Sequence, residues 1–153
     1  MAGTVGLLLA GGRGTRLGFH TPKALALFGR DTLLAHALAT LRDLCDDVVV
    51  CAPREMFLPV RAELRVADPE GAAGPLAGLV AGLESRPFRA ALALAVDLPL
   101  LSSALLEAIG ARLAGHLAVV PAPHGRSQPL AAWYAPEAVA PLSEALALGE
   151  RAP

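Results

Sequence analysis

The sequence predicts an α/β protein built on a mostly parallel sheet. Short apolar segments typical of strands alternate with longer segments whose apolar residues recur at helical spacing, as in βαβ units. One segment, Ala90 to Val96 (AALALAV), has no polar face, which suits a central parallel strand covered on both sides. The 153 residues are enough for one domain with its own core, and no repeat or interdomain linker interrupts them.

Each expected element has a local signal. The first strand, Thr4 to Ala10, is apolar and is stopped by glycines. Asp31 or Thr32 can cap the helix that follows, because six apolar residues then fall on one helical face: Leu33, Leu34, Ala37, Leu38, Leu41 and Leu44. The further strands are expected over residues 48–51, 64–67, 90–96, 117–120 and 130–134.

Four further helices are expected. A short helix over 54–63 is disturbed by Pro59, and a helix over 76–84 has Pro75 near its first turn. The third is capped by Ser102 or Ser103, and the last covers 137–148. One side of the third helix is expected to carry Leu105, Leu106, Ile109 and Leu113.

Composition excludes several classes of protein. A hydrophobic fraction of 54% with 18% charged residues indicates a globular chain, not a disordered one. A net charge of -1 without basic runs argues against nucleic acid as a main partner. We expect no membrane association and a cytoplasmic location, because no long apolar segment and no signal peptide is recognisable. Cys45 and Cys51 form no C-x-x-C pair and are expected to be small buried hydrophobic residues.

The stretch Leu7 to Lys23 (LLLAGGRGTRLGFHTPK) carries the strongest functional signal. Its glycines, among them Gly12 and Gly14, allow backbone N–H groups to approach an anion, and the cations Arg16 and Lys23 follow. The 13 basic residues of the chain are 12 arginines and this one lysine. A compact ammonium suits phosphate binding, so we interpret the stretch as a triphosphate-binding loop.

Two other interpretations of this loop stay open. The pattern Gly12-x-Gly14-x-x-x-Gly18 loosely matches a dinucleotide fingerprint. A Rossmann turn leads directly into its helix, however, whereas a long cationic segment separates strand from helix here. The remaining interpretation is a surface loop with incidental charges.

Other candidate residues follow later strands. Asp97 comes directly after the AALALAV strand and either caps a turn or binds a metal ion, for which magnesium is the expected choice beside phosphates. Asp68 either starts a turn or accepts a hydrogen bond from a sugar or base. Gly74 and Gly78 either shape the start of a helix or leave room for a nucleoside. Gln128 either presents its amide to a substrate or is a turn residue.

Several of these motifs together resemble a known family. The segments Leu9 to Gly18 and Thr21-Pro22-Lys23 resemble the signature of nucleotidyltransferases that activate small molecules with a nucleoside triphosphate. Three later segments are similar, in order and spacing, to the molybdenum cofactor guanylyltransferase (MobA-like) group: 74–78 (GPLAG), 96–100 (VDLPL) and 128–134 (QPLAAWY). The likeness covers nearly the whole chain.

The resemblance implies a Rossmann-like three-layer αβα sandwich of the glycosyltransferase-A-like nucleotidyltransferase type. It implies Mg²⁺-dependent transfer of GMP from GTP to molybdopterin, and transient contact with other molybdenum cofactor assembly proteins. Carried over by position, Arg16 and Lys23 would be the catalytic cations and Asp97 the metal ligand. The implied nucleotide-binding residues are Leu9, Ala10, Gly11, Gly12, Gly14, Lys23, Asp68, Gly74, Gly78 and Asp97.

Alternatives of function and extent stay open at this point. Another nucleotidyltransferase, using CTP or a sugar phosphate, would share the first motif, and a nucleotide-binding module without turnover would share the loop. A short-chain dehydrogenase is disfavoured because the only tyrosine, Tyr134, lies far from the only lysine. The family continues past a Gly-Glu-Arg segment into another strand and an Asn-containing motif, whereas this sequence has no asparagine. We therefore expect a single domain over 1–153 without that strand and tail.

Overall fold

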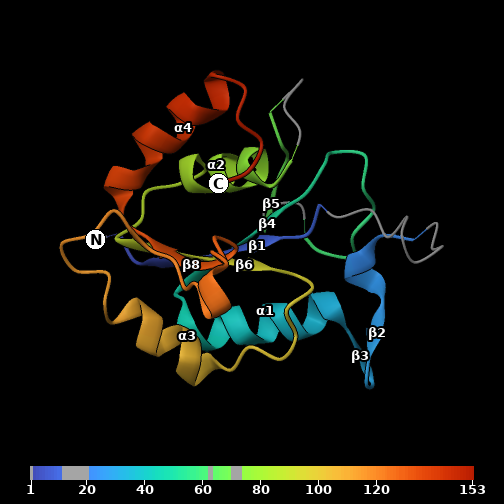
Figure 1. The fold of residues 1–153 in the computed structure, drawn as a ribbon. Helices are drawn as coiled ribbons and strands as arrows, with labels where there is room; N and C mark the ends of the chain where they lie inside the picture. Colours follow the sequence, from blue (N-terminus) through green and yellow to red (C-terminus); the bar gives the residue numbers. More distant parts are fainter. Residues whose placement is uncertain (1, 12–20, 62–63, 70–73) are drawn as a thin grey trace.

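A six-stranded sheet lies between two layers of helices in the computed structural model, which describes residues 2–11, 21–61, 64–69 and 74–153 (Figure 1). The order of strands across the sheet is β5-β4-β1-β6-β8-β7. The six strands are β1 Thr4–Leu9, β4 Asp47–Cys51, β5 Arg65–Val66, β6 Ala90–Ala95, β7 Ala118–Val119 and β8 Ala131–Tyr134. This arrangement confirms the expected αβα sandwich.

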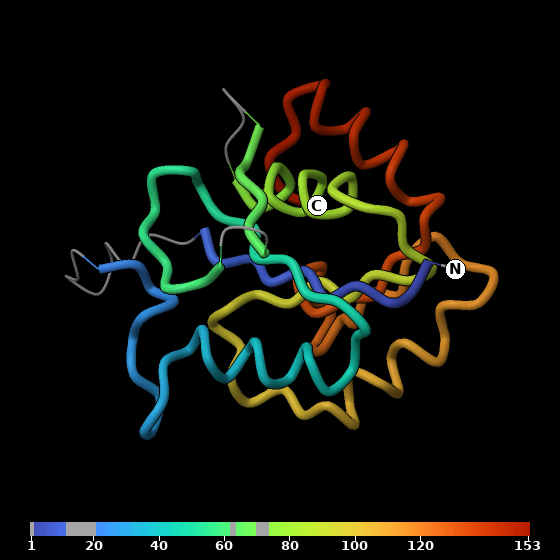
Figure 2. The backbone as a smooth tube through the Cα atoms, turned by 180° about the vertical axis from the view of Figure 1, so that it is seen from behind, coloured from blue at the N-terminus to red at the C-terminus, as the bar shows by residue number. Residues whose placement is uncertain are grey.

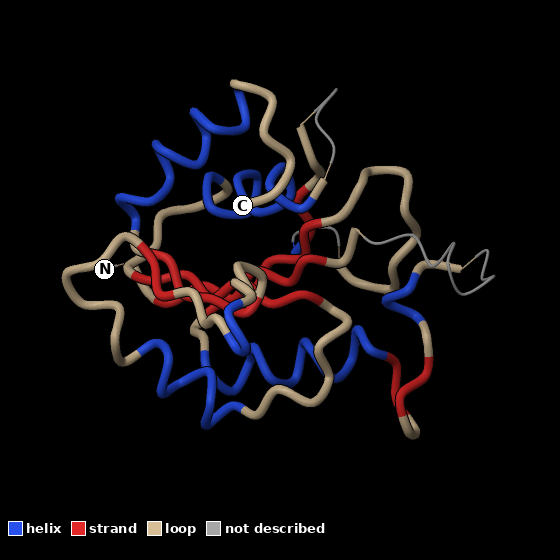
Figure 3. The backbone as a smooth tube through the Cα atoms, in the orientation of Figure 1, coloured by secondary structure: helices blue, strands red, loops and turns tan. Residues whose placement is uncertain are grey.

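The directions of the strands confirm a mostly parallel sheet. β1 pairs in parallel with both β4 and β6, and β5 pairs in parallel with β4. β8 is antiparallel to β6 and to β7, so it runs against the rest of the sheet. The strands form one continuous layer in Figure 3. Their central members are apolar on both faces, since Leu7 and Leu8, which point to opposite sides of β1, are both fully buried.

Four α-helices cover the two faces. α1 (Leu33–Leu44) and α3 (Ser103–Gly110) lie on one face, and α2 (Pro75–Glu84) and α4 (Val139–Ala147) on the other, as Figures 1 and 2 show from opposite sides. Each face has its own hydrophobic cluster, to which β8 contributes Trp133 on one side and Tyr134 on the other. None of the helices in the described ranges is long and apolar enough to cross a membrane.

The expected helix caps are present. Thr32 precedes α1, and its hydroxyl oxygen accepts a hydrogen bond from the Ala35 amide at 3.1 Å. Ser102 precedes α3 and accepts from the Leu105 amide at 3.2 Å. Each cap satisfies a first-turn N–H group that has no partner within its helix.

Two expectations about helices are wrong. The segment 54–61 forms turns and bends, because Pro59 lacks an N–H donor and the local bonds, Met56 N–H to Pro53 O and Val60 N–H to Leu58 O, each close only one tight turn. On α3, Leu106 is fully buried but Leu105 is 49% exposed, since a helix turns by about 100° per residue and Leu105 is thereby rotated away from the side on which Leu106 is buried.

The connection before α1 contains more structure than expected. A 3₁₀ turn, η2 (Lys23–Leu25), is followed by a two-stranded antiparallel hairpin of β2 (Leu27–Phe28) and β3 (Asp31–Thr32). This hairpin projects from the side of the molecule on which α1 begins (Figure 1). Two further 3₁₀ turns are η4 (Pro123–Gly125) and η5 (Pro136–Ala138).

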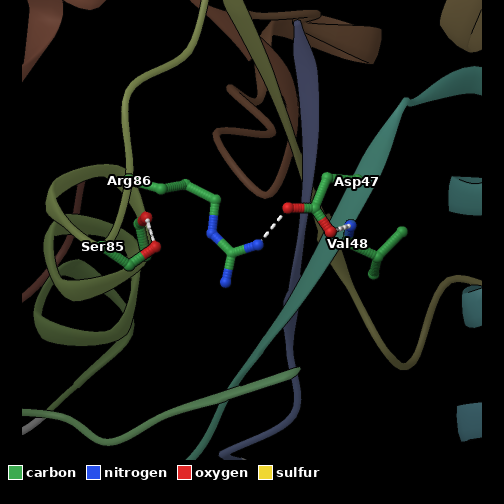
Figure 4. Close-up of polar contacts among 5 residues, drawn as sticks. Asp47, Val48, Ser85 and Arg86 are labelled. Atoms are coloured by element: carbon green, nitrogen blue, oxygen red, sulfur yellow. Dashed lines mark hydrogen bonds and ion pairs between the residues drawn. The ribbon is translucent and has the colours of Figure 1, made fainter. Parts of the chain in front are cut away.

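An ion pair marks the amino-terminal edge of the sheet. Arg86, just after α2, contacts the carboxylate of Asp47, the first residue of β4 (Figure 4). The other carboxylate oxygen of Asp47 accepts from the Val48 amide at 2.8 Å. The pair ties the end of α2 to the start of its neighbouring strand, at the opposite edge from the residues described next.

Candidate active site

The sheet has a switch point beside β1. From β1 the chain moves outward to β4 and β5, then returns to place β6 on the other side of β1. In open α/β sheets, ligands bind outside the carboxyl ends of the strands at such a point. Two backbone hydrogen bonds fix the turn after β1 there: Ala10 N–H to Cys51 O at 2.9 Å, and Val96 N–H to Leu9 O at 3.1 Å.

Lys23 and Asp97 meet at this switch point. The Lys23 ammonium lies 2.5 Å from Oδ2 of Asp97, although 74 residues separate them in the sequence. Their side chains are 31% and 42% exposed, so the pair is open to solvent on one side. The structure thus brings the lysine predicted to bind phosphate and a potential metal ligand into direct contact.

Local structure explains how Lys23 reaches this place. Pro22 is extended, with ψ of 136°, and η2 begins immediately after it. Ala24, in the same turn, is fully buried in the cluster under α1, which anchors the turn. The Ala26 carbonyl then accepts from the Leu33 amide at 2.9 Å and ties the segment to the start of α1. One buried alanine therefore holds the adjacent lysine at the edge of the sheet.

Asp68 forms the second part of the site, after β5. Burial, and to a lesser degree the negative charge of Glu55, raise the pKa of Asp68. Among the described residues, no hydrogen bond or ion pair neutralises this half-buried carboxylate. A carboxylate in that position is a candidate for accepting hydrogen bonds from a ligand.

Gly78 lets α2 approach Asp68 closely. A methyl group added at Gly78 would lie 3.1 Å from Cδ1 of Leu9 and 3.3 Å from Oδ1 of Asp68. It would also stand 3.8 Å from Cβ of Cys51. The ends of β1 and β4, the start of α2 and Asp68 therefore share one packed corner. Burial, with the negative charge of Asp68, raises the pKa of Cys51 to about 12, so this thiol stays protonated at neutral pH.

Gly74 has a different role at the start of α2. Its φ of 96° lies in the left-handed region that favours glycine. A methyl group there would come within 2.9 Å of the carbonyl oxygen of Arg151. The same oxygen accepts a hydrogen bond from the Leu76 amide at 3.1 Å. Segment 149–151 therefore supplies the partner for a first-turn N–H group of α2.

The structure places most of the predicted site residues at one edge of the sheet. The turn after β1, residues 9–11, lies between two groups of predicted site residues. On one side are Lys23 and Asp97. On the other side are Asp68, Gly74 and Gly78. Gly12, Gly14 and Arg16 lie outside the described residues. Gln128 is engaged through its backbone, which donates to Pro121 O and accepts from the Ala131 amide.

Sequence reasoning missed two neighbours of the site. Glu55 influences Asp68 across the carboxyl edge, and its only sequence signal was an acidic residue shortly after the β4 strand. The Arg151 carbonyl could not be foreseen, because a backbone oxygen carries no residue-type signal. Both contacts join segments that are distant in the chain.

The donor set fits a hard divalent cation held mainly by its substrate. Asp97 supplies carboxylate oxygen, the ligand that Mg²⁺ and Mn²⁺ prefer. Within the described ranges, no group of three or more potential ligands gathers. An ion at Asp97 would therefore complete its coordination with water and phosphate oxygens, as Mg²⁺ commonly does beside nucleotides.

Fold and site together define a class of protein. The site lies at a βαβ switch point and has a glycine-bearing turn after β1. It combines a cation paired with a carboxylate and Asp68, which no other described residue neutralises. These features suit a nucleotide whose phosphates and base lie across the strand ends. This is the arrangement of a nucleotide-dependent transferase.

The family follows from comparison with known proteins. Residues 6–152 match the MobA-like NTP transferase domain, and the chain belongs to this family of nucleotidyltransferases. It is 36% identical over 151 residues to a probable molybdenum cofactor guanylyltransferase of Chloroflexus aggregans. That alignment covers 95% of this chain and 72% of the relative.

Solved structures share the fold. Molybdopterin-guanine dinucleotide biosynthesis protein A from Archaeoglobus fulgidus superposes with a TM-score of 0.78 at 27% identity, covering 96% of this chain and 75% of that one. The 2-C-methyl-D-erythritol 4-phosphate cytidylyltransferase from Thermus thermophilus superposes with a TM-score of 0.71 at 25% identity, covering 98% and 79%. Two proteins named for different nucleotides thus have the same framework as this chain.

Proposed function

We propose that this protein transfers GMP from GTP to the phosphate group of molybdopterin, in a Mg²⁺-dependent reaction. The observation that carries the proposal is the contact of Lys23 with Asp97 at the switch point, close to the turn after β1. The names of the similar proteins support this choice of donor and acceptor. The Asp68 carboxylate, which has no neutralising partner among the described residues, supports a base that donates hydrogen bonds.

The reaction needs little covalent chemistry from the protein. An oxygen of the acceptor phosphate attacks the α-phosphorus of GTP, the bond from that phosphorus to the bridging oxygen breaks, and pyrophosphate leaves with the electron pair. Both reactants are anions, so the barrier contains their mutual repulsion. Positioning and charge neutralisation are therefore the main contributions required of the chain.

Each described residue has a role that follows from its position. The turn Leu9–Gly11 lines the floor at the switch point, and Lys23 neutralises phosphate charge. Asp68 accepts hydrogen bonds from the N1–H and amino groups of guanine. Asp97 holds the divalent cation, which when bound supplies positive charge to the phosphate oxygens. Gly12, Gly14 and Arg16, predicted to bind the triphosphate, stay predictions.

Variants of the pair at the site test the proposal against a matched pair elsewhere. Lys23→Ala and Asp97→Ala are each expected to lower the rate of GMP transfer by about 10²–10³-fold, because each removes charge stabilisation of the transferring phosphate. Asp47→Ala breaks an ion pair of similar exposure at the opposite edge of the sheet. It is expected to leave turnover unchanged. Turnover of both site variants at the parental rate would show that the site is misplaced.

One observation supports cytidylyl transfer as a second candidate activity. The fold likeness to a cytidylyltransferase shows that this framework also serves a protein named for cytidine transfer. Pyrophosphate release should be compared with GTP, CTP, ATP and UTP, each with molybdopterin and with a sugar phosphate. Release with GTP and molybdopterin alone is expected. GTP binding without release in any combination would favour a binding module.

Three further predictions from the sequence concern the setting of this activity. They are a single domain over residues 1–153, a cytoplasmic location, and transient contact with other molybdenum cofactor assembly proteins. Each stays a prediction.

A further inference from the structure

The loop of residues 120–130, which joins β7 to β8, lies at the same edge as the candidate site. β8 starts beside the end of β6, because these strands are antiparallel. The Ala95 amide donates to the Leu130 carbonyl at 2.8 Å, two residues before Asp97. The loop therefore leaves the sheet on the side where Asp97 meets Lys23.

The backbone of this loop is held in one shape by its own hydrogen bonds. Its base is closed by Gln128 N–H to Pro121 O at 2.8 Å, and its tip by Arg126 N–H to Pro123 O at 3.1 Å. At the tip, His124 has φ of 52°, which makes it the non-glycine residue with positive φ in the described ranges. An L-residue adopts this conformation at a conformational cost, which the surrounding hydrogen bonds offset. The turn thus presents the residue that follows it in a defined direction.

That residue is Arg126, and its side chain is available. Arg126 is exposed, and no described residue forms an ion pair or side-chain hydrogen bond with it. Lys23, the cation that contacts Asp97, is already engaged by that carboxylate. A guanidinium offers a planar surface for stacking on a ring and donors for several acceptors at once. Arg126 is therefore suited to a planar, hydrogen-bonding ligand group.

Sheet geometry decides which end of a ligand Arg126 can reach. Neighbouring strands are about 4.8 Å apart, so the loop leaves the sheet at β7, about 10 Å from β6, and returns at β8, about 5 Å from β6, the strand that precedes Asp97. The reacting phosphate of the acceptor must lie near Lys23 and Asp97. A residue of this loop, displaced by about one to two strand spacings along the edge, faces the part of the acceptor remote from its phosphate.

We propose that Arg126 is a specificity-determining residue for the acceptor, binding the heterocyclic end remote from the transferred group. The inference rests on the proposed function, since it assigns the acceptor's place in the same site. A contact at the remote end of the acceptor contributes the same binding free energy in the ground state and in the transition state. Loss of Arg126 should therefore raise the KM for the acceptor and leave kcat nearly unchanged.

The test uses Arg126→Ala and the matched variant Arg112→Ala in the full chain. Arg112 is also exposed, but it follows α3 at the amino-terminal edge. With saturating GTP and Mg²⁺ and varied molybdopterin, Arg126→Ala is expected to raise the KM about tenfold, the loss of one hydrogen bond to a charged group. The Kd of Arg126→Ala for GTP should stay at the parental value. The KM of Arg112→Ala for molybdopterin should also stay at the parental value.

A second matched pair tests whether the loop conformation positions Arg126. Gly125 and Gly115 have φ of 76° and 78°, and a methyl group added to either meets no atom within 4 Å. Alanine therefore introduces the same backbone strain at both. Gly125→Ala is expected to raise the KM for molybdopterin in the same direction as Arg126→Ala, while Gly115→Ala leaves it unchanged.

The outcomes separate this inference from the proposed function. If the parent transfers no GMP to molybdopterin, both fail. If the parent transfers GMP and Arg126→Ala retains its KM, or changes only kcat or GTP affinity, the inference about Arg126 alone fails. Equal increases in KM for Arg126→Ala and Arg112→Ala would also overturn it, because they would show a general effect of surface charge.

Discussion

Alanine at Gly78 should separate nucleotide binding from folding. The new methyl group would stand 3.1 Å from Cδ1 of Leu9 and 3.3 Å from Oδ1 of Asp68, so both must move by a few tenths of an ångström. The crowding costs up to about 1–3 kcal/mol, whereas removing a glycine from a helix interior recovers about 0.5–1 kcal/mol. The expected net loss in the free energy of unfolding is about 1 kcal/mol.

The loss of affinity for GTP should be larger than this loss of stability suggests. Displacing Asp68 should weaken the proposed hydrogen bond between its carboxylate and the base, and such charged bonds contribute about 1.5–3 kcal/mol. At 1.4 kcal/mol per factor of ten, the Kd for GTP should rise at least about tenfold. Titration calorimetry with GTP and Mg²⁺ measures the Kd, and urea unfolding measures stability.

Gly82→Ala is the matched control on the same helix. Its methyl group would lie 2.7 Å from Sγ of Cys51 and 3.2 Å from Leu7, a worse clash in the core, and Asp68 is not among its nearest atoms. It should destabilise the fold more than Gly78→Ala and leave the Kd of the folded protein unchanged. Parental GTP affinity in Gly78→Ala, or an equal loss of affinity in Gly82→Ala, would refute the reasoning.

Two further results are expected. Burial and the charge of Glu55 raise the pKa of Asp68, so acidification protonates this carboxylate above the usual pH range of an aspartate. Protonation removes the negative charge that accepts hydrogen bonds from GTP. The parent should therefore lose its higher GTP affinity relative to Asp68→Asn as the pH falls. Parallel pH profiles of the GTP Kd for these two proteins would contradict this. Trp133→Phe removes the buried hydrogen bond from the indole N–H to Leu106 O at 2.7 Å and should cost about 1–3 kcal/mol in urea unfolding. GTP affinity should not change, and a fall in affinity would mean that α3 couples to the site.

Local patterns were sufficient for most elements. The AALALAV run became β6, and Thr32 and Ser102 became the caps of α1 and α3, because these signals act over a few neighbouring residues. Prediction failed over 54–61, where a short helix was expected and Pro59 does not allow it. It also failed at Leu105, where the direction of burial depends on how α3 sits on the sheet.

The sequence by itself determined the α/β class, the order of its elements and the residue types expected at a nucleotide site, because glycine, lysine and aspartate have chemistry that does not depend on distant neighbours. Only the tertiary structure decided that Lys23 touches Asp97, that Gly78 gives room to Asp68, and that Arg126 shares their edge. These contacts come from the order and direction of strands far apart in the chain. Pairing between such strands is chosen by the packing of the whole sheet and leaves no signal in a short stretch of residues.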